Sequence, residues 1–137
     1  MDLGLAGRRA IVTGASKGIG LATTRRLVAE GVAVVTGARE TTAELKELVN
    51  TGSVIAVTVD LTSPDGPDGL VAAALDAGPV DILVNNAGAV TPRTGGFLSV
   101  SDEDWWRSLQ LTLMAAVRTT RAILPPARKL TGSLRGL

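Results

Sequence analysis

The segment Thr13-Gly14-Ala15-Ser16-Lys17-Gly18-Ile19-Gly20 has the residue types and spacing best suited to chemistry in this sequence. It follows a short apolar run and precedes a helical pattern, so it is predicted to join a strand to a helix. At such a junction Gly14 permits a tight turn, Gly18 lets a phosphate approach the backbone, and Gly20 lets helix and strand pack closely. The helix N-terminus adds unpaired N–H groups and the positive end of a dipole. The segment therefore predicts a phosphate-binding loop, with a ligand-free glycine turn as the alternative.

The spacing GxxxGxG after a leading threonine resembles that of the short-chain dehydrogenase/reductase family. Four further features match this family in order: Asp60-Leu61, Val80 to Val84, Asn85-Asn86-Ala87-Gly88, and Asp104 to Pro125. The resemblance implies that the aspartate contacts an adenine ring, and that the Asn-Asn-Ala-Gly segment steadies the sheet beside a dinucleotide. The candidate cofactor-binding residues are Gly14, Ser16, Lys17, Gly18, Ile19, Gly20, Arg39, Asp60, Leu61, Asn86, Ala87 and Gly88.

The end of the second predicted strand bears on which cofactor is preferred. An acidic residue at this place binds the ribose 2′-hydroxyl of NAD and repels a 2′-phosphate. Ala38 occupies that place, Arg39 follows it, and Lys17 adds a second cation in the glycine loop. Arginine binds phosphate through two N–H groups and lysine through its charge. NADP(H) is therefore favoured over NAD(H). The alternative is that Arg39 is a solvated loop residue, partly offset by Glu40.

The residues that would perform the family's chemistry are not found. Family catalysis uses a serine and a Tyr-x-x-x-Lys pattern, and this sequence contains no tyrosine. Only Lys129 and Ser133 follow the last predicted helix, and the segment around them matches nothing in the family. A fourth catalytic residue of many members, an asparagine on the long helix, is replaced by Thr112. No catalytic residue is assigned, and the chain by itself is expected to be inactive.

Short apolar runs alternate along the chain with amphipathic segments, and this alternation predicts the elements that position the loops. Strands are predicted at 9–13, 32–36, 54–59 and 80–84, and helices at 19–30, 41–50, 70–77 and about 103–124. Four successive strand–helix units indicate a parallel sheet with right-handed crossovers. The expected class is α/β, a Rossmann-like doubly wound sheet with strand order 3-2-1-4. We expect residues 1–137 to form a single NAD(P)-binding domain, incomplete on its C-terminal side.

Helix phases and boundaries can also be predicted. The first helix is expected to turn Ile19, Ala22 and Leu27 toward the core, and residues 63–69 are expected to form a loop. Helix ends are predicted at Gly31, at Gly78-Pro79 and at Pro125-Pro126, because glycine and proline terminate helices. Ser101 and Asp104 have the spacing of a capping box at the start of the last helix.

The last helix is apolar on two sides. One stripe consists of Trp105, Leu109, Leu113, Ala116, Val117 and Leu124, and further apolar residues off the stripe are Leu111, Met114 and Ala115. A helix with two apolar faces is normally buried twice, once on its sheet and once on a partner. The fourth strand would also be an open edge. We therefore expect a homo-oligomer formed through residues 105–124.

Composition excludes several classes of site. Without Cys or His there is no thiolate, no histidine metal site and no Ser-His-Asp triad, and no acidic cluster suggests another metal site. All 13 acidic residues lie within 1–104, whereas 105–137 carries 6 basic residues. No aromatic reading platform accompanies this charge, so nucleic-acid binding is not expected. No signal peptide or membrane-length apolar run is present, which favours the cytoplasm.

Two functions of different class remain open. One is an NADP(H)-dependent oxidoreductase for alcohol–carbonyl interconversion, present as its dinucleotide-binding half and active only when completed. The other is a non-catalytic dinucleotide-binding or interaction protein, and a third, weaker possibility is a chain that does not fold. The resemblance implies a small alcohol or carbonyl as substrate, whose identity cannot be read from this half.

Overall fold

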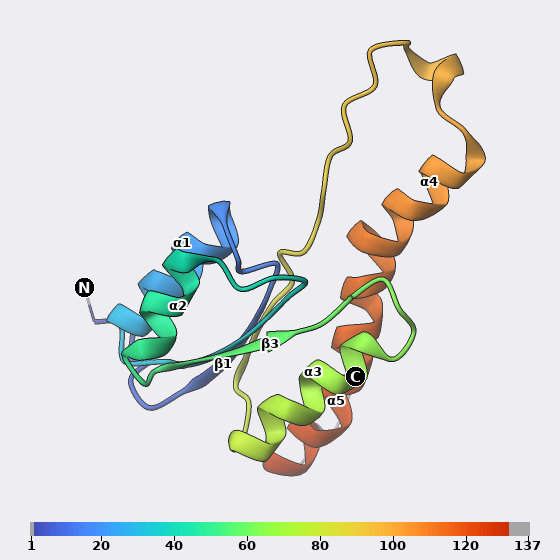
Figure 1. Ribbon diagram of the computed structural model, residues 1–137. Helices are drawn as coiled ribbons and strands as arrows, with labels where there is room; N and C mark the ends of the chain where they lie inside the picture. The colour runs from blue at the N-terminus through green and yellow to red at the C-terminus, as the bar shows by residue number, and fades with distance from the viewer. Residues whose placement is uncertain (1, 132–137) are drawn as a thin grey trace.

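The computed structural model describes residues 2–131 and shows a parallel sheet with helices on both faces (Figure 1). The strands are β1 (Arg9–Thr13), β2 (Ala33–Ala38), β3 (Val54–Thr58) and β4 (Ile82–Val84). Their order in the sheet is β3-β2-β1-β4, and every neighbouring pair is parallel. The predicted α/β class and strand order are therefore confirmed, with strand ends that differ from prediction by at most two residues.

The helices cover the two faces in pairs. They are α1 (Gly18–Ala29), α2 (Ala43–Asn50), α3 (Gly66–Ala77), α4 (Asp102–Leu109) and α5 (Ala115–Thr131), with a 3₁₀ turn η1 (Phe97–Ser99) and a π-helical turn η2 (Gln110–Met114). Helices α1 and α2 lie on one side of the sheet, and α3 and α5 on the other (Figure 1). The predicted terminators Gly31 and Gly78 both have positive φ, at 79° and 138°. The predicted capping box between Ser101 and Asp104 is present at the start of α4.

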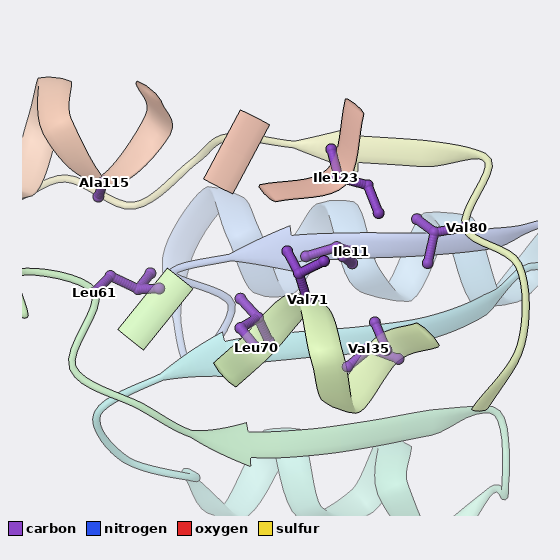
Figure 2. Packing of buried hydrophobic residues seen from close by; sticks show 9 residues of the cluster. Ile11, Val35, Leu61, Leu70, Val71, Val80, Ala115 and Ile123 are labelled. Carbon is purple, nitrogen blue, oxygen red and sulfur yellow. The ribbon is translucent and has the colours of Figure 1, made fainter. Parts of the chain in front are cut away.

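Two hydrophobic cores form because the side chains of the strands alternate between faces. Ile11 of β1 points toward α3 and α5, where it meets Val35, Leu70 and Val71 (Figure 2). Its neighbours Ala10 and Val12 point toward α1 and α2. All three residues are fully buried. Strand β1 is therefore apolar on both faces, as expected for an inner strand of a parallel sheet.

The phase of α1 differs from the prediction. Ile19 is 79% exposed and Ala22 is exposed, so neither faces the core, although Leu27 does pack against it. The buried residues of α1 are Gly20 and Thr24, and the Thr24 hydroxyl donates a hydrogen bond to the carbonyl of Gly20 at 2.9 Å. Gly20 has no side chain, so the first turn of α1 lies directly against Gly14 and Ala15 of the glycine loop.

Two predicted boundaries involving proline are wrong. Helix α3 begins at Gly66, inside the predicted loop 63–69, because Pro67 is tolerated where the first N–H groups need no intrahelical partner. Helix α5 continues past Pro125-Pro126 to Thr131. The φ angle of proline is compatible with a helix, and its cost is a lost hydrogen bond to the carbonyl four residues earlier. The two prolines therefore weaken α5 without ending it.

The long helical segment turns one row of residues to the sheet and leaves another exposed. Ala115, Thr119 and Ile123, spaced four residues apart, are buried. The predicted stripe lies on another face, where Leu113 is 52% exposed and Leu124 49%. Residues 85–96 leave the sheet and run to the far end of α4 (Figure 1).

Within residues 2–131 no helix is long and apolar enough to cross a membrane.

Candidate functional site

The candidate site lies where β1 and β4 end, and its base is the turn at Gly14. Gly14 has a φ of 67°, and a Cβ there would lie 2.9 Å from the Cα of Ala87. The Gly14 N–H donates to the carbonyl of Gly37 at 2.8 Å, which ties the loop to the end of β2. Both the backbone conformation and the close approach therefore require glycine here.

Gly20 supplies the close packing predicted for it. A Cβ at this position would overlap the side-chain amide nitrogen of Asn86 and the carbonyl of Gly14, and would lie 3.0 Å from the Cα of Ala15. The first turn of α1 can therefore lie directly against the loop and the segment after β4. Because glycine has no side chain, the start of α1, the glycine loop and the segment after β4 can meet at this point.

Thr13 and Asn86 join the two loops by reciprocal hydrogen bonds. The Thr13 Oγ1 accepts from the backbone N–H groups of Asn86 and Ala87, both at 3.0 Å. The Asn86 Nδ2 donates to the carbonyls of Thr13 and Gly14, both at 3.1 Å. Thr13 is 2% exposed, so these bonds are partly shielded from water. The amide nitrogen of Asn86 is therefore turned toward the protein and braces the glycine loop.

The start of α1 is open to a ligand. Gly18 has a φ of 58°, and no heavy atom lies within 4 Å of the position a Cβ would take. Lys17 is the N-cap, and no side chain among the described residues caps the first N–H groups of the helix. Ile19 is exposed beside them. An anion can therefore approach the free N–H groups and the positive end of the helix dipole.

Arg39 and Asp60 follow neighbouring strands, and the charge of Arg39 acts on the Asp60 carboxyl group. The hydroxyl of Thr62 donates to Asp60 Oδ1 at 2.7 Å, and its backbone N–H donates to the same oxygen at 2.9 Å. These bonds hold the pKa of Asp60 below its ordinary value, and the positive charge of Arg39 acts in the same direction. Arg39 is exposed and forms no ion pair within residues 2–131. Its guanidinium is thus free to bind an anion.

Leu61 is placed differently from the other candidates. Its side chain is 4% exposed and packs in the core beside Ala115 of α5 (Figure 2). Only its backbone can face a ligand. Nearby, Arg118 donates to the carbonyl of Thr62 at 3.4 Å and to Gln110 Oε1 at 2.9 Å. The loop that carries Asp60 and Leu61 is therefore held against the long helix.

The structure thus brings the candidate residues from the ends of β1, β2, β3 and β4 to one edge of the sheet. Ala87 and Gly88 lie beyond the Asn86 bonds, with Gly88 exposed. Ser16 is buried, at 8% exposure, and its carbonyl accepts a hydrogen bond from the Thr42 hydroxyl. Among the described residues, no group of three Asp or Glu side chains is placed to hold a metal ion.

Sequence reasoning missed two features of this region. The long helix contains the π turn η2, and Thr112, at the place of the family's asparagine, lies in it and is exposed. Such turns are frequent at functional sites, but no residue type signals one. The second feature is a hydroxyl of Thr42 bound to the glycine loop. Of the two residues that follow the last predicted helix, Lys129 lies within α5, and Ser133 lies outside the described residues.

Comparison with protein families identifies relatives over nearly the whole chain. The family described as short chain dehydrogenase matches residues 8–134. L-xylulose reductase from Mesocricetus auratus is 41% identical over 124 residues, which is 90% of this chain and 48% of the relative. Its counterpart from Homo sapiens is 39% identical over the same length. The chain therefore spans about half the length of the curated relatives it matches.

Solved structures give the same picture. L-sorbose reductase from Gluconobacter frateurii, complexed with NADPH and L-sorbose, superposes with a TM-score of 0.84 at 36% identity, covering 95% of this chain and 51% of that one. A 3-ketoacyl-(acyl-carrier-protein) reductase from Brucella melitensis, complexed with NADH, superposes with a TM-score of 0.80 at 28% identity, covering 91% and 52%. Similar structures thus carry either nicotinamide dinucleotide.

Proposed function

Because this chain belongs to the short-chain dehydrogenase/reductase family, we propose that it binds NADP(H) in preference to NAD(H). We further propose that residues 1–137 form one Rossmann domain, the cofactor-binding half of an oxidoreductase that interconverts an alcohol and a carbonyl. When bound, the nicotinamide would supply the hydride chemistry. The family's catalytic serine, tyrosine and lysine would come from outside these 137 residues, which contain no tyrosine.

The observation that carries the proposal is the open start of α1. A dinucleotide presents a pyrophosphate, and the uncapped N–H groups behind Lys17, together with the empty space at Gly18, suit such a group. The exposed Ile19 would lie against the bound cofactor and lose contact with water. Asp60 Oδ2 would accept from the adenine amino group, since Oδ1 is occupied by Thr62.

The preference for NADP(H) rests on charge. Lys17 and Arg39 are both exposed at the same edge of the sheet, and β2 ends at Ala38 rather than at an acidic residue. A 2′-phosphate would receive charge-assisted hydrogen bonds from these cations. NAD lacks that phosphate and would gain nothing from them. L-sorbose reductase, a structural neighbour with NADPH, supports this preference, and the neighbour from Brucella melitensis is complexed with NADH.

The test is calorimetric titration of the 137-residue chain with NADPH and, separately, with NADH. We expect saturable binding with NADPH preferred. Arg39→Gln should weaken NADPH binding by roughly tenfold or more, the loss of one hydrogen bond to a charged group, and leave NADH unchanged. Arg25→Gln, an exposed arginine on α1, is the control for net charge. A preference for NADH would overturn the cofactor assignment, and no binding of either would overturn the proposal.

The alternative is a non-catalytic dinucleotide-binding or interaction protein, and the absence of tyrosine favours it. The two proposals predict different responses to a second chain. A half-enzyme should gain reductase activity when mixed with the C-terminal half of a homologous reductase that carries the Tyr-x-x-x-Lys pattern. A dedicated binding protein should keep its NADPH affinity in this mixture without turnover.

We also propose that the chain self-associates through residues 105–124. A shallow groove on α5 is lined by Ala116, Val117, Thr120, Arg121 and Leu124. It continues the exposed apolar stripe of α4 and η2, which a single chain leaves in water. Light scattering should report a dimer or larger assembly, and Val117→Glu should shift it toward monomer. A wild-type chain that is monodisperse as a monomer would refute this proposal.

A further inference from the structure

The glycine loop carries Lys17 and the segment after β2 carries Arg39, the two cations proposed to bind a 2′-phosphate. Hydrogen bonds join these two segments at two points. At the inner point, the Gly14 N–H donates to the carbonyl of Gly37 at 2.8 Å. At the outer point, the Thr42 Oγ1 donates to the carbonyl of Ser16 at 2.6 Å, although 26 residues separate them. Lys17 directly follows the outer tie on one segment. Arg39 lies between the two ties on the other.

Thr42 has a second bond that fixes its own position. It is the N-cap of α2, and its Oγ1 accepts from the backbone N–H of Leu45 at 3.4 Å. Leu45 is 1% exposed in the core between α2 and the sheet. The hydroxyl is therefore anchored from the helix side and donates toward the glycine loop. The bond from Thr42 to Ser16 is partly buried, and its length of 2.6 Å lies at the short end of the usual range for O–H···O bonds.

From this arrangement we infer that Thr42 is a specificity-determining residue, whose hydroxyl sets the separation of Lys17 and Arg39 and so the affinity for a 2′-phosphate. Both cations have long side chains, so their ammonium and guanidinium groups converge on one phosphate only when their backbones are held at a fixed spacing. Without the outer tie the α2 start and the glycine loop can move apart. The pyrophosphate contacts at Gly18 belong to the glycine loop alone and would remain.

This inference rests on the proposed dinucleotide function, and its test uses two probes that differ only in the 2′-phosphate. These probes are adenosine 2′,5′-bisphosphate and 5′-AMP, each titrated into the 137-residue chain. In Thr42→Val the ratio of the two affinities should fall by about fivefold, which corresponds to one hydrogen bond. Thr42→Ser keeps the hydroxyl and should restore the ratio.

A matched control lies at the other end of the same helix. Thr51 donates its hydroxyl to the carbonyl of Leu48 at 2.6 Å, so Thr51→Val removes a bond of equal length without touching the glycine loop. It should leave the affinity ratio unchanged. If Thr42→Val does not fold, Thr42→Gly removes the same hydroxyl while keeping most of the capping preference.

Each outcome decides between named alternatives. A reduced ratio in Thr42→Val, restored by Thr42→Ser and absent in Thr51→Val, supports the inference. An equal loss of affinity for both probes, or no loss, overturns it and leaves the proposed cofactor function standing. Failure of the wild-type chain to bind either probe overturns the proposed function and this inference together.

Discussion

Substitution of Gly20 by alanine tests whether the junction of α1 with the two loops is held as tightly as the structure shows. The new Cβ would overlap the Asn86 amide nitrogen and the Gly14 carbonyl, and the latter is backbone that cannot rotate away. Overpacking of this kind costs about 1–3 kcal/mol. The two Asn86 hydrogen bonds would be lost as well, at about 1 kcal/mol each. The better helix propensity of alanine returns about 1 kcal/mol.

The net expectation for Gly20→Ala is a loss of roughly 2–4 kcal/mol in the free energy of unfolding, from the combined magnitudes above. At this chain length that lowers Tm by roughly 10 °C, followed by far-UV circular dichroism. Gly69→Ala is the control, because Gly69 lies in α3 with no heavy atom within 4 Å of a Cβ. It should raise Tm slightly. A Gly20→Ala chain as stable as wild type would refute the packing argument.

Three further outcomes follow from other contacts. Thr13→Val leaves two backbone N–H groups without an acceptor, so it should lower the free energy of unfolding, measured by urea denaturation, by about 2 kcal/mol or more. Because valine and threonine have the same shape, the change would be nearly neutral if those bonds were absent. The bonds from Thr62 lower the folded-state pKa of Asp60, so their stabilisation is complete above about pH 4 and disappears as pH falls through the folded-state value. As the pH is lowered into the acid range, the Tm of Asp60→Asn should therefore fall less steeply than that of the wild-type chain. The same slope in both proteins would contradict this. Gly78→Ala forces a φ of 138° on a residue with a Cβ and should cost about 1 kcal/mol or more, whereas a stability gain would show that the end of α3 can rearrange.

The sequence predicted the sheet well because its signals are local. Each strand is an apolar run that ends at a glycine or polar residue. In β1 the consecutive apolar residues Ala10, Ile11 and Val12 indicate burial on both faces, and all three are buried. The glycine loop was predicted for the same reason, since a strand, a Gly-rich turn and a helix follow one another directly. The positive φ values at Gly14 and Gly18 agree with the turn that the spacing requires.

What the sequence could not provide depends on contacts between distant residues. Ile19 has the spacing of a core residue, but it is exposed, and the buried residues of α1 are Gly20 and Thr24. The bond from Thr42 to Ser16 spans 26 residues and has no periodic pattern. Pro125-Pro126 has the sequence pattern of a helix end, yet helix α5 continues to Thr131. Local propensity is overridden wherever tertiary contacts contribute more free energy.

The hydrogen bonds between Thr13 and Asn86 also bear on how the sheet avoids misalignment. Slippage of a strand by one residue normally exposes its apolar face, but β1 is apolar on both faces, so slippage carries little penalty from burial. Thr13 is paired with Gly37 in the observed alignment, and Val12 with Val84. Displacement by one residue would remove the Thr13 hydroxyl from the two N–H groups that follow β4 and place a valine there. The bonds that shape the ligand loop therefore also fix the register of the inner strands.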